Sequence, residues 1–372
     1  MKVTLVAGAR PNFMKIAPII DAIRAAQSEG KPISYRLVHT GQHYDKNMSD
    51  SFFTELGIPH PDANLECGGG TQAEQAANIM VRFEQELFAH PTDLVLVVGD
   101  VTSTMSCSIA AKKLNIDVAH VEAGIRSGDM TMPEEVNRIV TDSITDLFFT
   151  TSEVANGNLR RGGVSDDRIH FVGNTMIDTL LKQRARFSAP AFWTELALQP
   201  QQYFVMTLHR PANVDDAEGL RALIATITDT ARGLPVIFPV HPRTVRNLKQ
   251  FEISAPNLHL VEPMSYLQFN YLVERARAVI TDSGGITEET TVLGVPCITL
   301  RNSTERPETV TMGTNELIGT DPAALPPYMD KLFDGSWKQG RIPDLWDGRT
   351  APRIVDILLR KYAAQAAALQ QN

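Results

Sequence analysis

The sequence AVITDSGGITEE, residues 278–289, joins a short apolar run to a stretch with the pattern of a helix. The run 278–281 is rich in β-branched residues, which is typical of a buried strand. Two glycines follow it, and glycine lets a ligand approach the backbone closely. The N-terminus of a helix offers free N–H groups to an anion. This stretch therefore predicts a strand, a turn and a helix, with an anion site at the turn.

The same alternation of a strand pattern and a helix pattern recurs along the chain. Short β-branched runs, each followed by a helical pattern, occur at residues 3–7, 35–39, 94–98, 118–121, 147–150, 169–172, 203–208, 236–240, 258–261, 278–281 and 297–300. Several are apolar throughout, as expected for strands covered on both faces. The sequence predicts an α/β protein with two doubly wound, Rossmann-like parallel sheets and a ligand cleft between the two domains.

The length of 372 residues fits two domains of about 100–200 residues each. The stretch 174–201 has no strand pattern and carries Pro190 and Pro200. We expect an N-terminal domain over residues 1–175 and a C-terminal domain over residues 176–350. Residues 351–372 are rich in alanine and leucine and are expected to form a final helix.

Composition restricts the class of protein. Lys and Arg number 35 against 43 Asp and Glu, and this net charge of −8 disfavours nucleic acid as a partner. No apolar stretch is long enough to cross a membrane, and the first apolar run is too short for a secretory signal. The cysteines, Cys67, Cys107 and Cys297, have no paired spacing, which favours a reduced, cytoplasmic protein. Cys107 and Cys297 are expected in the core.

Polar clusters follow most of the predicted strands. The carboxyl ends of parallel strands share one rim, where open sheets bind ligands. The residues expected at this rim are Arg10, Lys15, Asp100, Glu122, His209, His241, Ser283, Gly284 and Gly285.

Some of these residues also have a structural interpretation. Asp100 could cap a helix, because Thr102 and other hydroxyl residues follow it. Glu122 directly ends a buried strand, where a purely structural glutamate would need a partner, so a functional role is favoured. His209 and His241 could be ordinary loop histidines, although an arginine follows each within two residues.

Glu134 and Arg138 lie in the stretch PEEVNR, where Pro133 suits the first turn of a helix. Glutamates in a first turn favour the helix dipole. Residues four apart share one face of a helix, so Glu134 and Arg138 could simply pair. One of them could instead face the ligand, and the spacing does not decide between these possibilities.

The turn at residues 283–285 predicts a phosphate site. Arg10, Lys15 and a second basic cluster at Arg301 and Arg306 suit a phosphate that backbone N–H groups also hold. Glu289 is too negative to face that phosphate and better suits a pair of vicinal hydroxyls, such as those of a ribose. A nucleotide with a diphosphate meets both requirements.

Two common cofactor motifs are missing from the sequence. It has neither G-x-G-x-x-G after a strand nor GxxxxGK[ST], so NAD(P) and ATP-type phosphoryl transfer are disfavoured and no cofactor is predicted. His39 and His43 are four apart but follow a strand, so a metal site is not predicted there.

Eight motifs together resemble the non-hydrolysing UDP-N-acetylglucosamine 2-epimerases. In order they are GARPNFMKIAP, GDVTST, HVEAGIRS, PEEVNR, TLHRPANV, VHPR, TDSGGITEE and TERPE. The resemblance implies a two-domain fold of the glycosyltransferase B type, with a C-terminal helix that crosses back to the first domain. It also implies a cytoplasmic homodimer and UDP-GlcNAc and UDP-ManNAc as substrates.

The resemblance also implies a role for each matching residue. The acids at the reacting sugar would be Asp100, Glu122 and Glu134, with His209 near the leaving group. The residues that bind the substrate would be Arg10, Lys15, Arg138, His241, Met264, Phe269, Ser283, Gly284, Gly285, Glu289 and Arg306. Among these, Glu289 would hold the ribose, and Phe269 and the backbone of Met264 would lie at the uracil.

One position departs from many members of the family. Asn12 follows the first proline, where many members carry an acid. This leaves open whether the sugar is plain GlcNAc or a modified relative.

The chemistry implied by the resemblance explains the need for several carboxylates. The proton on carbon 2 of an N-acetyl sugar is not next to a carbonyl carbon, so its direct removal gives an unstabilised carbanion. Elimination of UDP from carbon 1 avoids this by forming a glycal, and UDP then adds back with protonation of the opposite face. Each face needs its own acid or base, and clustered carboxylates raise one another's pKa. Asp100 and Glu122 are expected to move the proton, in roles that stay open, and closure of the protein is expected to retain the glycal.

Three other functions are compatible with these residues. A hydrolysing 2-epimerase would release UDP and free ManNAc. A glycosyltransferase of the same fold would need an acceptor groove and fewer acids. A non-catalytic sensor would bind UDP-GlcNAc without turnover.

Overall fold

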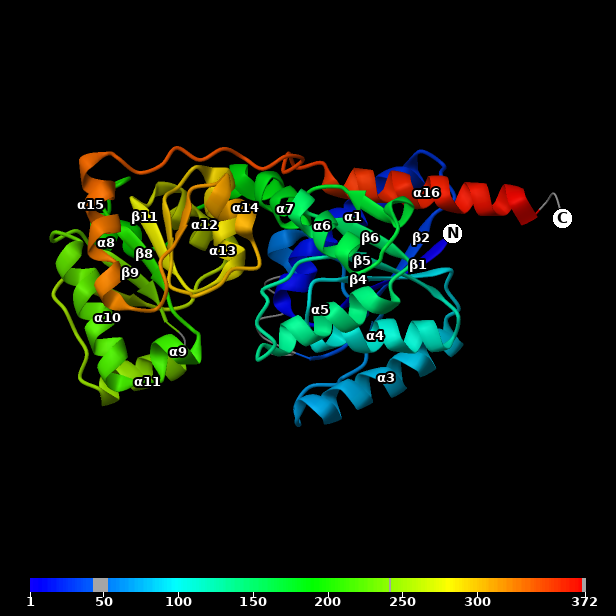
Figure 1. Ribbon diagram of the computed structural model, residues 1–372, viewed down its shortest axis with the longest axis horizontal. Helices are drawn as coiled ribbons and strands as arrows, with labels where there is room; N and C mark the ends of the chain where they lie inside the picture. The colour runs from blue at the N-terminus through cyan, green and yellow to red at the C-terminus, as the bar shows by residue number, and fades with distance from the viewer. Residues whose placement is uncertain (43–52, 241, 370–372) are drawn as a thin grey trace. The chain divides into compact units, whose positions relative to one another are not determined.

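The computed structural model of the chain describes residues 1–42, 53–240 and 242–369 (Figure 1). It divides into two compact units. The first unit comprises Met1–Lys182 and Asp344–Asn372, and the second comprises Gln183–Pro343. Each unit is built on its own parallel sheet with helices on its faces, which confirms the predicted fold class.

In the described residues, the sheet of the first unit has seven parallel strands in the order β3-β2-β1-β4-β5-β6-β7. They are β1 (Lys2–Ala7), β2 (Ser34–His39), β3 (Ala63–Asn64), β4 (Leu94–Val98), β5 (Asp117–Val121), β6 (Leu147–Thr150) and β7 (Ile169–Phe171). The central strands β1 and β4 are buried on both faces, as their unbroken apolar runs predict.

Helices cover both faces of this sheet. They are α1 (Arg10–Ser28), α3 (Gln72–Ala89), α4 (Thr102–Lys113), α5 (Pro133–Ile144), α6 (Glu153–Arg161), α7 (Thr175–Gln183) and α16 (Thr350–Leu369), with a 3-10 turn, η1 (Asp166–Arg168). Helices α1 and α16 pack together on one face, and α3, α4 and α5 lie on the other (Figure 1). Ile79 and Phe83 of α3 and Cys107 of α4 meet Val95 of β4 in one core cluster.

The sheet of the second unit has six parallel strands among the described residues, in the order β10-β9-β8-β11-β12-β13. They are β8 (Phe204–Thr207), β9 (Val236–Pro239), β10 (Leu258–Val261), β11 (Ala278–Thr281), β12 (Cys297–Thr299) and β13 (Asn315–Leu317).

The helices of the second unit also form two layers. They are α8 (Phe192–Glu195), α9 (Pro211–Val214), α10 (Ala217–Thr230), α11 (Pro242–Gln250), α12 (Tyr266–Arg275), α13 (Gly284–Leu293), α14 (Pro307–Thr311) and α15 (Pro326–Asp334), with the 3-10 turns η2 (Arg184–Arg186) and η3 (Pro322–Ala324). Successive residues of a strand point to opposite faces. Phe204 and Met206 of β8 accordingly join the core cluster that includes α10 and α15, while Val205 joins the cluster that includes α12.

Each sheet has a point where its strand order reverses direction. In the first unit this is between the neighbouring strands β1 and β4, and in the second unit it is between β8 and β11. Ligands of open α/β sheets bind at such points, outside the carboxyl ends of the strands. The motifs around Lys15 and Asp100 follow β1 and β4, and those around His209 and Ser283 follow β8 and β11.

The strand predictions agree with the structure, apart from two short additions. All eleven predicted runs form strands, with ends that shift by no more than one residue at most positions. Strands β3 and β13 were not predicted, because two or three residues at a sheet edge leave no apolar run to recognise. Cys67, Cys107 and Cys297 are buried thiols without a disulfide.

The segment between the second unit and α16 is anchored within the first unit. Trp346 is fully buried, and its Nε1 donates to the carbonyl of Thr151 at 2.9 Å. The carboxylate of Asp178 accepts from the backbone N–H groups of Thr350 and Ala351, where α16 begins. None of the helices among the described residues is both long enough and apolar enough to cross a membrane.

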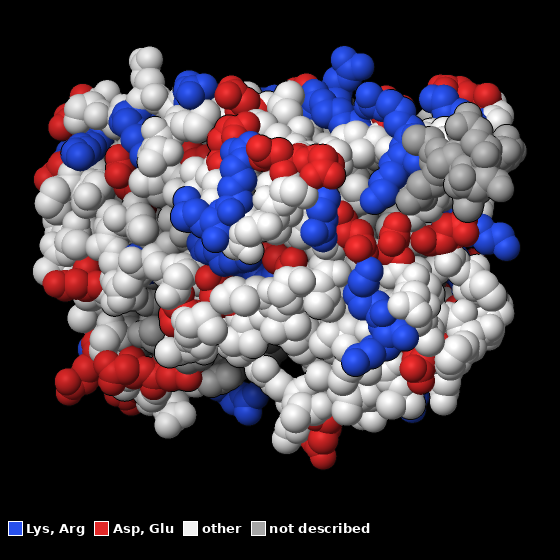
Figure 2. Space-filling view, turned by 45° about the vertical axis from the view of Figure 1, so that its right-hand side comes forward, with Lys and Arg blue, Asp and Glu red and all other residues white. Residues whose placement is uncertain are grey.

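Charged side chains of both signs are interspersed on the face shown in Figure 2. The described residues form no continuous basic surface on that face.

Candidate active site

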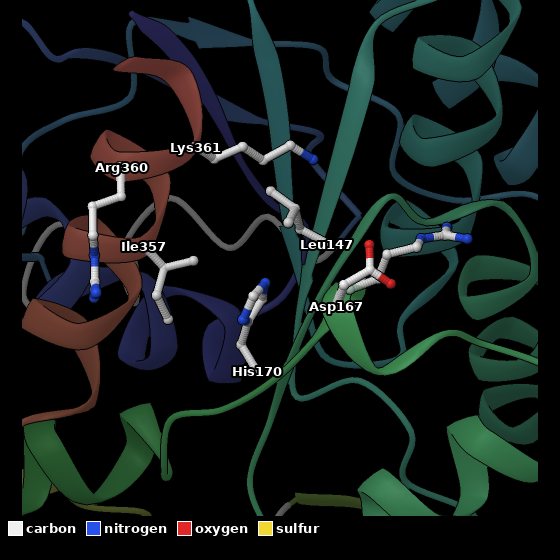
Figure 3. Close-up of a pocket in the computed structure, with 7 residues that line it drawn as sticks. Leu147, Asp167, His170, Ile357, Arg360 and Lys361 are labelled. Atoms are coloured by element: carbon white, nitrogen blue, oxygen red, sulfur yellow. The ribbon is translucent and has the colours of Figure 1, made fainter. Parts of the chain in front are cut away.

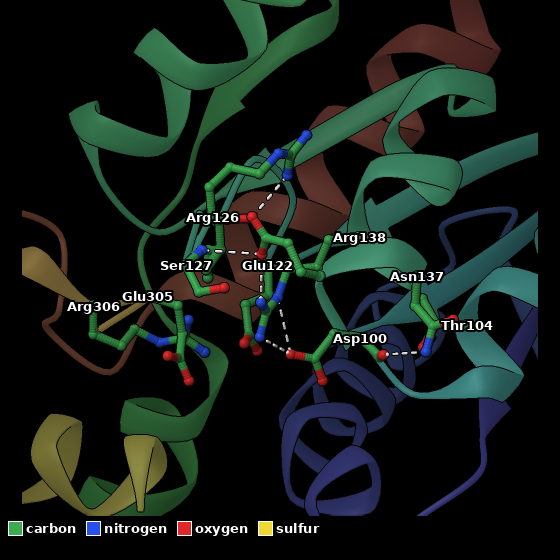
Figure 4. A network of polar contacts seen from close by, with 12 residues as sticks. Asp100, Thr104, Glu122, Arg126, Ser127, Asn137, Arg138, Glu305 and Arg306 are labelled. Carbon is green, nitrogen blue, oxygen red and sulfur yellow. Dashed lines mark hydrogen bonds and ion pairs between the residues drawn. The ribbon is translucent and has the colours of Figure 1, made fainter. Parts of the chain in front are cut away.

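Two carboxylates leave neighbouring strands of the first unit at the same edge. The register of β4 and β5 pairs Val98 with Val121. Asp100 follows β4 and Glu122 follows β5, so the two side chains start from adjacent strands, which lie about 4.8 Å apart. Figure 4 shows both residues in one polar network with Arg138.

The backbone of Glu122 has a conformation that L-residues rarely adopt. Its φ is +73°, in the left-handed region. Strain of this kind persists where the surrounding structure imposes it, and it gathers at functional sites. The turn directs the buried carboxylate toward α1, where it forms an ion pair with the ammonium of Lys15.

Lys15 also borders the turn before Asp100. Gly99 has a φ of +67°, and a β-carbon added to it would lie 3.0 Å from Lys15 Nζ. A side chain at residue 99 would therefore crowd the Lys15 ammonium as well as strain the backbone. This explains the glycine directly after β4.

The side-chain amide of Asn12 has structural partners at both ends. Its Oδ1 accepts from the N–H groups of Gly8 and Ala9, and its Nδ2 donates to the carbonyl of Val98 at 3.2 Å. An acid could accept the first two hydrogen bonds but, when ionised, could not donate the third. The amide thus ties the start of α1 to the end of β4.

Arg138 holds Asp100 from α5. Its Nε and Nη2 lie 3.1 Å and 2.5 Å from Oδ2 of Asp100, and its Nη1 donates to Glu135 at 2.7 Å. Val101 occupies the N-cap position of α4, so the alternative that Asp100 caps this helix is wrong. The carboxylate is held by a cation instead.

Glu135 was not predicted as a site residue. It is buried, and its carboxylate accepts from the N–H groups of Ser127 and Gly128 as well as from Arg138. Burial alone would raise the pKa of Glu135, but these hydrogen bonds outweigh burial and the pKa lies below its ordinary value. Its spacing of three residues from Arg138 was the only signal in the sequence.

Glu134 differs from its neighbour. It is half-buried in the first turn of α5, and no hydrogen bond or ion pair joins it to the described residues. The pairing of Arg138 with a first-turn glutamate therefore involves Glu135. A half-exposed carboxylate without a partner remains available to a ligand.

In the second unit, the predicted glycine turn begins a helix. Ser283 is the N-cap of α13, and Gly284 and Gly285 are its first residues. The Ser283 hydroxyl makes no capping hydrogen bond. A β-carbon on Gly285 would meet no atom within 4 Å, so the helix N-terminus is open beside it. This geometry suits an anion.

Asp282, just before this turn, holds His209. Its carboxylate is fully buried, lies 2.7 Å from His209 Nδ1 and accepts from the N–H groups of His209 and Arg210. Burial would raise the pKa of Asp282, but these partners keep it below its ordinary value. Because a carboxylate only accepts, this contact puts a proton on Nδ1 of His209, whose side chain is otherwise exposed.

Two buried arginines lie in the predicted second basic cluster. Arg306 Nε lies 2.5 Å from Glu288, and Arg301 Nη2 donates to Glu305 at 2.7 Å. A β-carbon on Gly284 would lie 2.6 Å from Glu305 Oε1. The Arg301–Glu305 pair is therefore next to the α13 turn. Nη1 of Arg301 is buried and has no hydrogen bond to the described residues.

Glu289 is buried one turn further along α13. The hydroxyl of Tyr266 donates to its Oε1 at 2.8 Å. Burial raises the pKa of Glu289 to about 7, with the nearby charge of Glu288 acting in the same direction. This carboxyl is thus poised to change its ionisation near neutral pH.

The remaining predicted residues have simpler surroundings. Met264 and Phe269 are partly buried and pack against the core cluster that includes Val279 and Leu272. Arg10 is exposed at the first position of α1. His241 and His43 lie outside the described residues. Within residues 1–42, 53–240 and 242–369, no group of three His, Cys, Asp or Glu could hold a metal ion.

A cavity of about 470 Å³ lies at the opposite edge of the first sheet. It is lined by Leu147, Asp167, Arg168, His170, Ile357, Arg360 and Lys361. Figure 3 shows Arg360 and Lys361 leaving α16 in different directions, so their charges do not meet at one point. The cavity lies where β6 begins, away from the predicted site residues.

Comparisons with known proteins agree with this geometry. A sequence model described as UDP-N-acetylglucosamine 2-epimerase matches residues 25–359. The UDP-N-acetylglucosamine 2-epimerase of Methanocaldococcus jannaschii is 38% identical over 96% of this chain and 99% of its own. Its crystal structure in complex with UDP-GlcNAc and UDP is similar to this chain with a TM-score of 0.85, over 96% and 99% of the two chains.

A second relative acts on a different sugar by its name. It is the UDP-2,3-diacetamido-2,3-dideoxy-D-glucuronate 2-epimerase of Pseudomonas aeruginosa, 38% identical over 86% of this chain and 88% of its own. Both relatives are named as 2-epimerases of UDP-linked acetamido sugars. The matched region includes every predicted site residue except Arg10 and Lys15, which precede it. This chain belongs to the UDP-N-acetylglucosamine 2-epimerase family.

Proposed function

We propose that the protein interconverts UDP-GlcNAc and UDP-ManNAc by eliminating UDP and adding it back. The observation that carries this proposal is the placement of Asp100 and Glu122 on adjacent strands, each against its own cation. Two fixed carboxylates at one edge can serve the two faces of one sugar ring. This supports proton removal on one face and proton delivery on the other.

In the first step, a carboxylate takes the proton from carbon 2 while the bond between carbon 1 and the β-phosphate oxygen breaks. The electron pair of the C–H bond forms the double bond of 2-acetamidoglucal, and UDP leaves as an anion. In the second step, UDP attacks carbon 1 and a carboxylic acid protonates carbon 2 on the other face. Atoms and charge balance without an oxidant, so the reaction as written uses no cofactor.

The departing UDP needs positive partners, because charge grows on its β-phosphate as the bond breaks. Residues of the second unit would supply them: the N–H groups at the start of α13, the Nε2 of His209 and the buried guanidinium of Arg301. Glu289 would accept hydrogen bonds from the ribose hydroxyls. In the first unit, Lys15 and Arg138 hold the two acids, and Glu134 is a third candidate at the sugar.

A modified sugar is the second candidate substrate. The relative from Pseudomonas aeruginosa, at 38% identity, is named for a diacetamido uronate. Both substrates share the acetamido group at carbon 2 and the UDP leaving group, so the same steps apply to each. They differ at carbons 3 and 5, where the uronate carries a second acetamido group and a carboxylate.

The test is a product analysis with each sugar nucleotide. Purified protein is incubated with UDP-GlcNAc without added cofactor, and the nucleotide sugars are separated by anion exchange. We expect UDP-ManNAc to accumulate to an equilibrium that the reverse reaction also reaches. Free ManNAc and UDP as main products would instead identify a hydrolysing enzyme. Turnover of the diacetamido uronate alone would establish the second candidate, and binding without turnover of either sugar would contradict the proposal.

A further inference from the structure

A buried histidine links the turns that carry the two candidate acids. His120 on β5 is fully buried. Its Nε2 lies 2.8 Å from the carbonyl oxygen of Gly99, the residue before Asp100. Its Nδ1 lies 2.8 Å from Oδ1 of Asp142 on α5.

The partners of His120 determine its protonation. A peptide carbonyl oxygen can only accept a hydrogen bond, so Nε2 must donate to Gly99. An ionised carboxylate also only accepts, so Nδ1 must donate to Asp142. Burial would raise the pKa of Asp142, yet its hydrogen bonds and charge interactions with His120 and Arg126 hold it below the ordinary value. The guanidinium of Arg126, which stays charged and only donates, favours the ionised carboxylate whatever the state of His120. His120 is therefore an imidazolium, in a buried ion pair with Asp142.

The second oxygen of Asp142 extends the link to the other acid. Its Oδ2 accepts from the N–H of Gly124 at 3.1 Å and from Arg126 Nη1 at 2.6 Å. Gly124 lies two residues after Glu122 and has a φ of +78°. A continuous chain of hydrogen bonds thus runs from the turn at Gly99 to the turn at Gly124.

The same helix also holds the side chain of Asp100. Asp142 and Arg138 are both on α5, one turn apart, and Arg138 binds the Asp100 carboxylate. The His120–Asp142 pair fixes the backbone on either side of the acids, while Arg138 fixes one of their side chains. Both turns contain left-handed residues, Gly99 and Glu122, whose conformations need such external support.

We propose that His120 and Asp142 are positioning residues for the epimerase reaction. Their buried ion pair holds the Gly99–Asp100 turn and the Glu122–Gly124 turn at a fixed separation, so that both carboxylates reach carbon 2 of one sugar. Neither residue touches the substrate in this role. The inference rests on the proposed function, because it assigns the two acids to a single reaction.

Two conservative variants separate the two hydrogen bonds of His120. In H120N the amide is short and can reach Asp142 but not Gly99. In H120Q the longer amide can reach Gly99 and gives up Asp142. If the pair positions the acids, each variant should lower kcat by roughly 10–100-fold with KM for UDP-GlcNAc nearly unchanged, since small misplacements of reacting groups have effects of this size.

Asp146 provides a matched structural control. Its carboxylate accepts from the N–H of Val118, at the opposite end of β5, and pairs with Lys112. D146N removes a comparable support for the same strand, far from Glu122. It should lower the melting temperature and leave kcat as in the wild type. A loss of stability in H120N and H120Q with kcat within about twofold of wild type would show a purely structural role and overturn the proposal.

A third measurement does not depend on activity. NMR of protein with ¹⁵N-labelled histidine should show one residue with both ring nitrogens protonated, as the two acceptors of His120 require, and its signals should be absent in H120N. Amide hydrogen exchange at Gly99–Asp100 and at Gly124 should quicken in H120N but not in D146N. A neutral His120 ring, or unchanged exchange at both turns, would overturn the proposal even if the wild type turned over no sugar nucleotide. Inactive wild type with the expected NMR and exchange results would count against the proposed function alone.

Discussion

The hydroxyl of Tyr266 donates to the buried carboxyl of Glu289 at 2.8 Å, at a site where burial raises the pKa of that carboxyl to about 7. The ionised form accepts hydrogen bonds from ribose hydroxyls more strongly than the neutral form. Ligand binding and proton release are therefore expected to be coupled.

Affinity for UDP-GlcNAc should fall as the pH drops through 7. Only about a tenth of Glu289 is ionised one unit below its pKa, so Kd should rise by up to about tenfold between pH 8 and pH 6. UDP-GlcNAc suits calorimetry here because its phosphates do not titrate in this range. E289Q should bind more weakly and lose this pH dependence. If the Kd of E289Q depends on pH as strongly as that of wild type, a group other than Glu289 causes the pH dependence.

The same carboxyl predicts how stability varies with pH. The pKa of Glu289 is raised from 4.5 in the unfolded chain to about 7 in the folded protein. Between these values the folded state binds more protons, so its contribution to stability is full below pH 4.5 and is lost as the pH rises through 7. E289Q lacks this loss, so its free energy of unfolding relative to wild type should increase from pH 5 to pH 8, by at most about 3 kcal/mol. Its melting temperature should rise relative to that of wild type over the same range. A constant difference across this range would contradict the raised pKa.

The Asp282–His209 pair predicts that the single substitution D282N lowers kcat strongly. D282N places an amide N–H beside Nδ1 of His209, which disfavours the tautomer that the carboxylate holds. We expect kcat to fall by about 100-fold or more. The kcat of H209N and of the double variant should be similar to that of D282N, because the two residues act as one unit. Independent, additive losses in kcat would show that Asp282 does not act through His209.

Lys15 and Glu122 form a buried ion pair. Its contribution to the stability of the protein can be measured separately from the role of Glu122 in turnover. K15M leaves a buried carboxylate without its cation and should destabilise the protein by about 3–5 kcal/mol. The double variant K15M/E122Q removes both charges and should recover most of this stability. It should remain inactive, since the acid is lost. Denaturant unfolding and turnover would be measured on the same samples, and full activity in the double variant would exclude Glu122 as an acid or base.

Asp178 is expected to stabilise the N-terminus of the C-terminal helix. Its carboxylate caps α16 by accepting from Thr350 and Ala351. D178A should destabilise the first unit by about 0.5–2 kcal/mol, the usual range for a lost N-cap. Hydrogen exchange should show faster opening of α16, whereas exchange in β8 to β13 should not change. Hydrogen exchange that quickens equally in both sheets would instead show that D178A destabilises the whole protein.

The sequence was sufficient to predict the fold because buried parallel strands leave unbroken apolar runs. Every run of four or more residues found in this way forms a strand, whereas β3 and β13 are too short to leave one. The position of Asp100, Glu122, His209 and Ser283 just after strands was also predictable, since turns with glycine and charge follow directly after those runs.

What the sequence could not predict was the partner of each charged residue. Glu135 and Asp282 lie within the predicted motifs PEEVNR and TDSGGITEE, and Asp142 follows PEEVNR, yet their roles depend on contacts made across the fold. Asp142 meets His120 across 22 residues and Asp282 meets Asn213 across 69. Spacing along a helix could suggest the pair of Arg138 and Glu135, but no local pattern reports that both nitrogens of His120 face acceptors.

Proton NMR of the protein with UDP-GlcNAc in deuterated water tests the central claim most directly. Removal and return of the carbon 2 proton through a carboxylate that exchanges with solvent should place deuterium at carbon 2 of UDP-ManNAc and, with time, of the recovered UDP-GlcNAc. D100N and E122Q should lose this exchange while still binding UDP-GlcNAc. UDP-ManNAc that retains the original proton at carbon 2, or no exchange despite binding, would contradict elimination and re-addition by these two carboxylates.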